Sequence, residues 1–181
     1  MTPLLLWRHP KPTGAAGRCI GSGSDLHVDP RRARRLARRI ATVARRELLP
    51  SVVWCSPLRR CRAVAHHLRR LGFKVRVDAR LAELHFGTWE GQPWSAIPRG
   101  DIDAWVADFA HHAPGGGESL TQLLQRLAEW RREQPSAPAL LVISHAGVMQ
   151  SLAWQAAHPA RLPTATEWGL PPRYGELRRE N

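Results

Sequence analysis

Short continuous runs of apolar residues recur along the chain, at positions 3–7, 51–55 and 138–144. Runs of this kind are typical of parallel strands that are covered on both faces. The segment 74–77 alternates apolar and polar residues, which predicts a strand nearer an edge of the sheet. A last edge strand is expected at 174–178, within a proline-rich tail.

Segments with helical spacing of apolar residues separate these runs. Two of these segments begin at the pairs Asp29-Pro30 and Ser56-Pro57. In each pair the first residue is a favourable helix N-cap, and proline is favourable in the first helical turn. The predicted helices run from residue 30 to before 50, from about 57 to 71, near 101–111, from 119 to about 132 and from about 147 to 157.

The alternating order of strands and helices predicts an α/β fold, a three-layer α/β/α sandwich with a mostly parallel central sheet. The length of 181 residues favours a single domain over residues 1–181. Ligands of such sheets bind beyond the carboxyl ends of the strands.

Cationic and imidazole side chains follow three of the predicted strands. Arg8 and His9 follow the first, Arg59 and Arg60 the second, and His145 the last buried one. Each alone has a structural explanation, as a histidine at a strand end or a solvated arginine in a first helical turn. Their coincidence at equivalent strand ends favours one anion site, because a cationic cluster at the end of a dry sheet needs an anion. The planar guanidinium binds two phosphate oxygens at once.

This set of groups suits transfer of a phosphoryl group. A neutral imidazole attacks phosphorus when its other nitrogen donates a hydrogen bond that fixes the tautomer. The second imidazole stabilises the oxygens of the transition state. The departing alcohol needs a proton from a carboxylic acid, for which Glu83 and Glu90 are candidates that spacing alone does not separate. No cluster of acidic and histidine residues suggests a metal site.

The formal net charge of +12 comes almost entirely from arginine and suits anionic partners. A codon bias toward arginine explains the same excess, and both explanations stay open. The arginine-rich segment 31–46 lacks interleaved aromatic residues, so it is interpreted as a solvated amphipathic helix. A nucleic-acid-binding module and a non-catalytic interaction module remain as alternatives to an enzyme.

The number of cysteines and the hydropathy of the chain indicate the cellular compartment in which the protein is expected. The cysteines Cys19, Cys55 and Cys61 form neither a disulfide framework nor a CxxC pair, which is typical of free thiols in a reducing cytoplasm. No signal peptide and no apolar stretch of membrane-spanning length is recognisable. A soluble cytoplasmic protein is therefore expected.

The motifs RHP, SPLRR, LAELHFGTWEG, GGGES and SHAG occur in this order between residue 4 and about 155. Together they resemble the histidine phosphatase superfamily, which is phosphoglycerate mutase-like. The resemblance implies that His9 accepts the phosphoryl group, that Arg8 and Arg60 hold it, that His145 completes the pocket and that Glu83 is the proton donor. It implies a small phosphomonoester as partner, no cofactor, no metal, and neither nucleic acid nor membrane.

Within the superfamily, the loop AAGRCIGSGSDLHVD resembles that of small bacterial α-ribazole phosphatases of cobalamin assembly. This implies α-ribazole 5′-phosphate as substrate and makes Ser24 and Asp25 substrate-loop candidates. The loop departs from the family pattern at Gly23, Ser24 and His27, which keeps another small phosphomonoester open as substrate. The short segment before GGGES favours a hydrolase over a phosphoglycerate mutase-type phosphotransferase. Glu90 is interpreted as structural.

Overall fold

A five-stranded sheet forms the centre of the computed structural model, which describes residues 2–180. The strand order is β3-β2-β4-β1-β5. The neighbours from β3 to β1 pair in parallel, and β5 pairs antiparallel with β1. The strands are β1 (Leu4–Arg8), β2 (Val52–Cys55), β3 (Lys74–Val77), β4 (Leu140–Ser144) and β5 (Leu177–Glu180).

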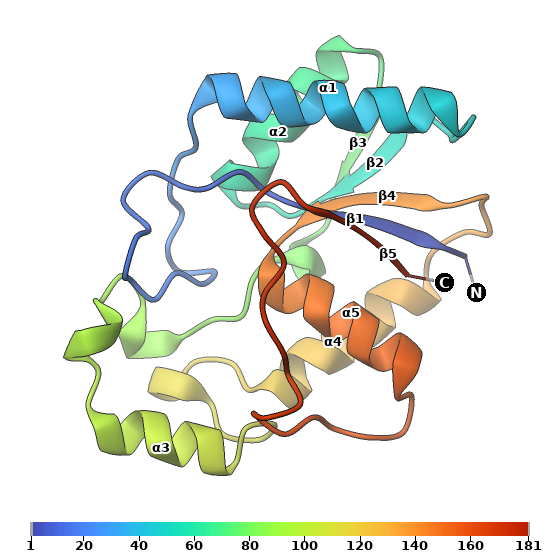
Figure 1. Cartoon of the computed structure of the whole chain (residues 1–181). Helices are drawn as coiled ribbons and strands as arrows, with labels where there is room; N and C mark the ends of the chain where they lie inside the picture. Colours follow the sequence, from blue (N-terminus) through green and yellow to red (C-terminus); the bar gives the residue numbers. More distant parts are fainter. Residues whose placement is uncertain (1, 181) are drawn as a thin grey trace.

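Helices cover both faces of the sheet (Figure 1). One face carries α1 (Pro30–Arg46) and α2 (Arg59–Arg70), and the other carries α4 (Leu120–Arg132) and α5 (Ala146–Ala157). The helix α3 (Arg99–Ala107) lies apart from the sheet, in the connection between β3 and α4. Short 3₁₀ helices are η1 (Ala79–Leu81), η2 (Gly87–Trp89), η3 (Trp94–Ala96) and η4 (Pro114–Gly116). The predicted three-layer α/β/α sandwich is confirmed.

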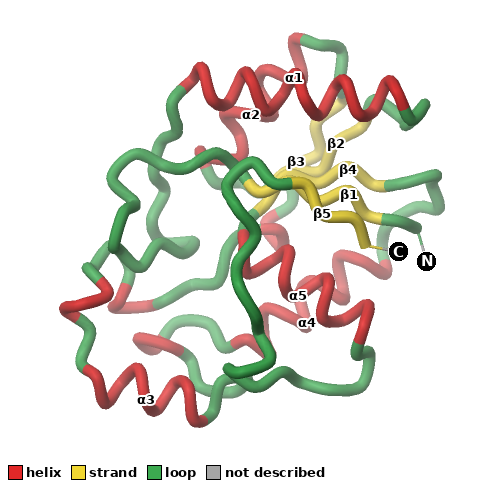
Figure 2. The backbone as a smooth tube through the Cα atoms, viewed as in Figure 1, coloured by secondary structure: helices red, strands yellow, loops and turns green. Residues whose placement is uncertain are grey.

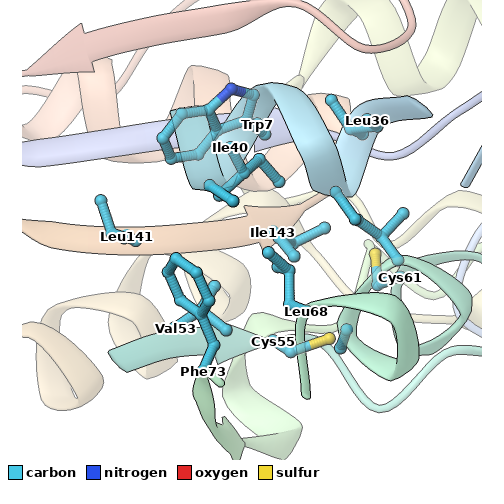
Figure 3. Packing of buried hydrophobic residues seen from close by; sticks show 14 of the residues in the cluster. Trp7, Leu36, Ile40, Val53, Cys55, Cys61, Leu68, Phe73, Leu141 and Ile143 are labelled. Atoms are coloured by element: carbon cyan, nitrogen blue, oxygen red, sulfur yellow. The ribbon is translucent and has the colours of Figure 1, made fainter. Parts of the chain in front are cut away.

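The strand β1 explains why the sheet needs two helical layers. Its side chains alternate between two hydrophobic cores, because successive residues of a strand point to opposite faces. Leu5 and Trp7 pack with α1 and α2, as Figure 3 shows for Trp7, whereas Leu4 and Leu6 pack with α4 and α5. With both faces buried, only the ends of the strand remain for polar groups.

The helix α1 shows how the arginine-rich sequence is accommodated. Its buried stripe consists mostly of small residues, with Leu36 and Ile40 as the largest, and Asp29 caps its first turn by accepting from the Arg31 N–H at 2.7 Å. Its arginines lie on the exposed or half-buried sides. The expected amphipathic helix is therefore present.

Three boundaries differ from the sequence predictions. The helix expected to begin at Ser56-Pro57 begins at Arg59, and the Ser56 hydroxyl accepts from the Leu58 N–H at 3.3 Å, just before the helix, as well as bonding to the His145 ring. The helix expected near 101–111 spans Arg99–Ala107, directly after Pro98. The last strand spans 177–180 rather than 174–178, since the preceding residues contact the side chain of Arg8.

Loops gather beyond the carboxyl ends of the parallel strands (Figure 2). The segment 9–29 and the tail before β5 both pass this end of the sheet. Within residues 2–180, no helix is both long enough and apolar enough to cross a lipid bilayer.

Candidate active site

The four groups predicted at the strand ends converge. Arg8 ends β1 and His9 follows it, Arg60 lies in the first turn of α2, and His145 directly precedes α5. The ring centroids of His9 and His145 are 5.0 Å apart. The Arg60 Nε donates to His145 Nδ1 at 3.2 Å, so the arginine after β2 reaches the histidine after β4.

His9 is buried and is held as a neutral imidazole. Its Nδ1 lies 2.7 Å from the carbonyl oxygen of Pro10, and because a carbonyl only accepts, Nδ1 carries the proton. Burial lowers the pKa of His9 well below its usual value, and the cations Arg60 and Arg8 lower it further. The lone pair of Nε2 is therefore available, as a nucleophile at phosphorus requires.

His145 takes the opposite tautomer. Its Nδ1 accepts from Arg60, so the proton lies on Nε2, which donates to the Ser56 hydroxyl at 2.7 Å. Burial, followed by the charge of Arg60 and the proximity of His9, lowers the pKa of His145 well below its usual value. Both ring nitrogens have protein partners, so this histidine acts on the pocket through Arg60. Ser56 is a site residue that the sequence analysis interpreted only as a helix cap.

Arg60 is almost fully buried, and its partners are a ring nitrogen and two main-chain carbonyls. Its Nη1 donates to Ser24 O at 2.6 Å and its Nη2 to Gly21 O at 2.9 Å. No ion pair in the described part of the chain involves Arg60 or Arg8. Two guanidinium groups without a carboxylate in an ion pair form a ready site for an anion.

The half-buried Arg8 is held by the C-terminal tail. Its Nη1 donates to Pro172 O at 2.6 Å, and its guanidinium carbon lies 3.9 Å from the ring centroid of Tyr174. Its Nε is buried without a hydrogen-bond partner among residues 2–180. Burial lowers the pKa of Arg8, while Tyr174 and Glu83 oppose that shift. The sequence analysis missed Tyr174, because nothing in the tail indicates that it returns to this arginine.

Glu83 follows η1 in the chain, and its carboxylate reaches the first turn of α5. The residue is buried, with 8% of its surface exposed. One carboxylate oxygen accepts from the Leu84 N–H at 3.1 Å and the other from the Gly147 N–H at 3.2 Å. A Cβ atom on Gly147 would lie 2.5 Å from the Glu83 carboxylate, so a larger residue there would displace this carboxylate. The carboxyl group is thus fixed beside Arg8, with which it lines one cavity.

Glu90 holds the loop that carries the partners of Arg60. One of its oxygens accepts from the Gly21 N–H at 2.9 Å and from the Ser24 hydroxyl. The other accepts from the N–H groups of Gly23 and Phe86, both at 3.1 Å. Four internal donors on one carboxylate favour the structural interpretation of Glu90.

The two substrate-loop candidates also have internal partners. Ser24 bonds to Glu90, and Asp25 accepts from the Arg59 N–H at the start of α2 at 2.7 Å. His27, one of the departures from the family pattern, accepts from Arg59 Nη1 at 2.8 Å. In the described part of the chain neither Ser24 nor Asp25 lines the cavity. Both candidates fasten the loop instead of facing the space beside the arginines.

A cavity of about 410 Å³ lies next to Arg8 and Glu83, and most of the residues that line it are apolar, six of them aromatic. From Trp94 through Phe86, Trp105 and Phe109 to Trp168, successive ring centroids are 5.4 to 6.0 Å apart. Charged groups on the wall are Arg8, Arg18 and Glu83. The space beside Arg8 and Glu83 therefore suits an apolar, ring-shaped group.

A metal does not need to supply the positive charge here. Within residues 2–180, no group of three or more histidine, cysteine, aspartate or glutamate side chains could hold a metal ion. The guanidinium groups of Arg8 and Arg60 provide the charge at the mouth of the sheet.

The fold and site define an α/β protein with two buried histidines and two arginines gathered at the carboxyl ends of its parallel strands. The chain belongs to the histidine phosphatase superfamily (branch 1), whose family model matches residues 4–172. The motif-based resemblance is thereby confirmed.

Relatives with a described activity are phosphatases. The chain is 35% identical over 150 residues to glucosyl-3-phosphoglycerate phosphatase of Mycobacterium tuberculosis, covering 70% of this chain and 64% of that protein. The match thus spans less than two thirds of the relative's length. A solved structure of a mycobacterial glucosyl-3-phosphoglycerate phosphatase with VO3 has a TM-score of 0.79 at 25% identity, covering 99% of this chain and 90% of that one.

The α-ribazole phosphatase of Shigella flexneri is also structurally similar. Its TM-score is 0.76 at 22% identity, with 98% of this chain and 89% of that chain covered. At this identity the likeness concerns the fold alone.

The buried neutral histidines predict a loss of stability on the acid side. A pKa below 6.5 in the folded state means that only the unfolded chain takes up the proton as pH falls through 6.5. We expect the free energy of unfolding to decrease between pH 7.5 and pH 5.5, by up to about 1.4 kcal/mol per pH unit and histidine. Urea denaturation at both pH values measures this decrease.

The control is His9→Gln, which removes one of the two buried histidines whose pKa is lowered. Its decrease should be smaller than that of the unchanged protein, whatever its absolute stability. An equal decrease in both proteins would show that His9 does not stay neutral in the folded state.

Proposed function

We propose that this protein is a phosphomonoester hydrolase that works through a phosphohistidine at His9. The observation that carries the proposal is the free Nε2 of a neutral His9 beside two guanidinium groups without ion pairs. The machinery extends from β1 to the tail before β5, so we propose that residues 1–181 act as one catalytic domain.

In the first step, Nε2 of His9 attacks phosphorus, and the bond between phosphorus and the alcohol oxygen breaks. Arg8 and Arg60 bind the non-bridging oxygens, where their fixed charge is most effective as the transition state forms. Glu83 gives its proton to the departing alcohol, which leaves as a neutral molecule. His145 sets the guanidinium of Arg60, and a direct bond to the phosphoryl group would require its Nε2–H to leave Ser56.

In the second step, water attacks the phosphohistidine and the bond between Nε2 and phosphorus breaks. The ionised Glu83 takes the proton of the water, which restores the acid form for the next turnover. Phosphate is released and His9 returns to the neutral state. These two steps require no catalytic side chain beyond those named.

The alcohol part of the substrate is proposed from the aromatic cavity. Its wall favours a flat, apolar ring system, which α-ribazole 5′-phosphate carries as a benzimidazole. This supports a role in cobalamin assembly. A second candidate is glucosyl-3-phosphoglycerate, favoured by the 35% identity to the mycobacterial phosphatase. Its carboxylate would need a cation, and beyond Arg8 the cavity wall offers Arg18.

The intermediate gives the first test of the reaction. Rapid quench with ³²P-labelled substrate should trap an acid-labile, base-stable phosphoryl group on the protein. His9→Ala should abolish both labelling and turnover, because no other neutral imidazole nitrogen is free in the site. Turnover of the variant at the level of the unchanged protein would contradict the mechanism.

The substrate assignment is tested by comparing kcat/KM for α-ribazole 5′-phosphate and glucosyl-3-phosphoglycerate. We expect the benzimidazole ester to be preferred, because the cavity wall is mainly apolar and includes six aromatic residues. Arg18→Ala serves as the matched control and should leave that preference unchanged. A higher kcat/KM for the glucosyl ester, lost in Arg18→Ala, would favour the second candidate instead.

The role of Glu83 is tested by the basicity of the leaving group. An alkoxide cannot depart readily without a proton, whereas nitrophenolate can. Glu83→Gln should therefore slow hydrolysis of alkyl phosphates by about 100-fold or more, and hydrolysis of p-nitrophenyl phosphate clearly less. The comparison requires conditions in which phosphorylation of His9 limits the rate.

Glu90→Gln is the matched control, because Glu90 contacts the loop and not the cavity. Its losses should be similar for both substrates and accompanied by lower thermal stability. A leaving-group dependence in Glu90→Gln, with none in Glu83→Gln, would reverse the assignment of the acid.

A further inference from the structure

The tail before β5 is fastened across the mouth of the site. We call residues 168–176 the C-terminal strap. One end is held by the Gln150 amide, which donates to Trp168 O at 2.8 Å. At the other end the Arg8 N–H donates to Glu176 O, and the Gly175 N–H donates to Arg8 O, both at 3.0 Å. The strap is thus tied through its backbone to the residue that carries the phosphate-binding guanidinium.

Within the strap, Tyr174 contacts two groups of the phosphate pocket. Its ring centroid lies 3.9 Å from the guanidinium carbon of Arg8 and 5.6 Å from the ring centroid of His9. The face of an aromatic ring attracts a cation, most strongly where water is excluded. Arg8 is half-buried with its Nε buried without a partner among the described residues, while Tyr174 is 40% exposed.

We propose that Tyr174 is a positioning residue that holds the guanidinium of Arg8 beside His9. In this position the Nε–H of Arg8 is free to donate to a phosphate oxygen. The proposal rests on the proposed function, because it assigns Arg8 to phosphate. Pro172 O fixes one end of the guanidinium and the ring fixes its plane. The strap thereby contributes to phosphate capture as well as to the cavity wall.

The competing interpretation is that Tyr174 only lines the cavity for the alcohol. Inorganic phosphate and vanadate separate the two, because neither carries an alcohol group. A cavity wall would affect the binding of esters alone. A positioning residue would affect the binding of the free anions as well.

The experiment measures the Kd of inorganic phosphate by calorimetry and the inhibition constant of vanadate for Tyr174→Leu and Tyr174→Phe. The leucine variant keeps an apolar side chain without a ring, and we expect it to bind both anions about tenfold more weakly. The phenylalanine variant keeps the ring and should stay within about twofold. Leu170→Ala, an 87% exposed position in the same strap, should bind as the unchanged protein does.

A double-mutant cycle with Arg8→Gln tests whether Tyr174 acts through Arg8. In the Arg8→Gln background, Tyr174→Leu should have little further effect on phosphate binding. Thermal melting of all four proteins of the cycle shows whether a variant is less stable, so a loss of phosphate binding can be separated from a loss of folding. An equal loss in both backgrounds would overturn the proposal.

The remaining outcomes are also decisive. Unchanged anion binding in Tyr174→Leu, with a higher KM for esters, would leave Tyr174 as a cavity wall only. An equal loss in the phenylalanine and leucine variants would make the hydroxyl, not the ring face, responsible. Anion binding needs no turnover, so the expected pattern without any ester hydrolysis would support the positioning role and contradict the hydrolase.

Discussion

Positive charge without ion pairs, at the end of a buried sheet, is the constraint on which this structure depends. Removing a guanidinium from water is costly unless its donors are satisfied. Arg60 obtains two main-chain carbonyls from the loop after β1, and Arg8 obtains Pro172 O and the face of Tyr174 from the strap. These partners accept hydrogen bonds or attract the cation without cancelling its charge. The pocket therefore remains selective for an anion while staying folded.

The positive charge of the two arginines also helps to set the protonation state of His9 and His145. Burial, Arg60 and Arg8 together keep His9 neutral, and the carbonyl of Pro10 selects the tautomer with a free Nε2. In the proposed mechanism, the same cationic surroundings would attract the phosphate and keep the nucleophile neutral. The surroundings of Glu83 differ, since its carboxylate accepts backbone N–H groups at the first turn of α5. The protonation state of each group therefore depends on which strand or helix ends beside it at the carboxyl ends of the parallel strands.

Much of the fold could be predicted, because β1 and β4 are apolar runs that need cover on both faces. The convergence of Arg8, His9 and His145 followed from parallel strands ending at one edge. Spacing could not separate Glu83 from Glu90, since only the hydrogen bonds of the folded chain distinguish a carboxylate beside the cavity from one that holds a loop. The helix start predicted at Ser56-Pro57 was too early, since the helix begins at Arg59, and the bond of the Ser56 hydroxyl to His145 could not be predicted because the two residues are distant in the sequence.

The two arginines are oriented by different segments that also shape the cavity. The loop after β1 supplies carbonyls to Arg60 and places Ala15 and Ile20 on the cavity wall. The strap supplies Pro172 and Tyr174 to Arg8 and places Trp168 on the same wall. A change in either segment that enlarges the cavity also shifts the partners of a guanidinium. In the proposed hydrolase, selection of the alcohol and affinity for phosphate would therefore be coupled through these two segments.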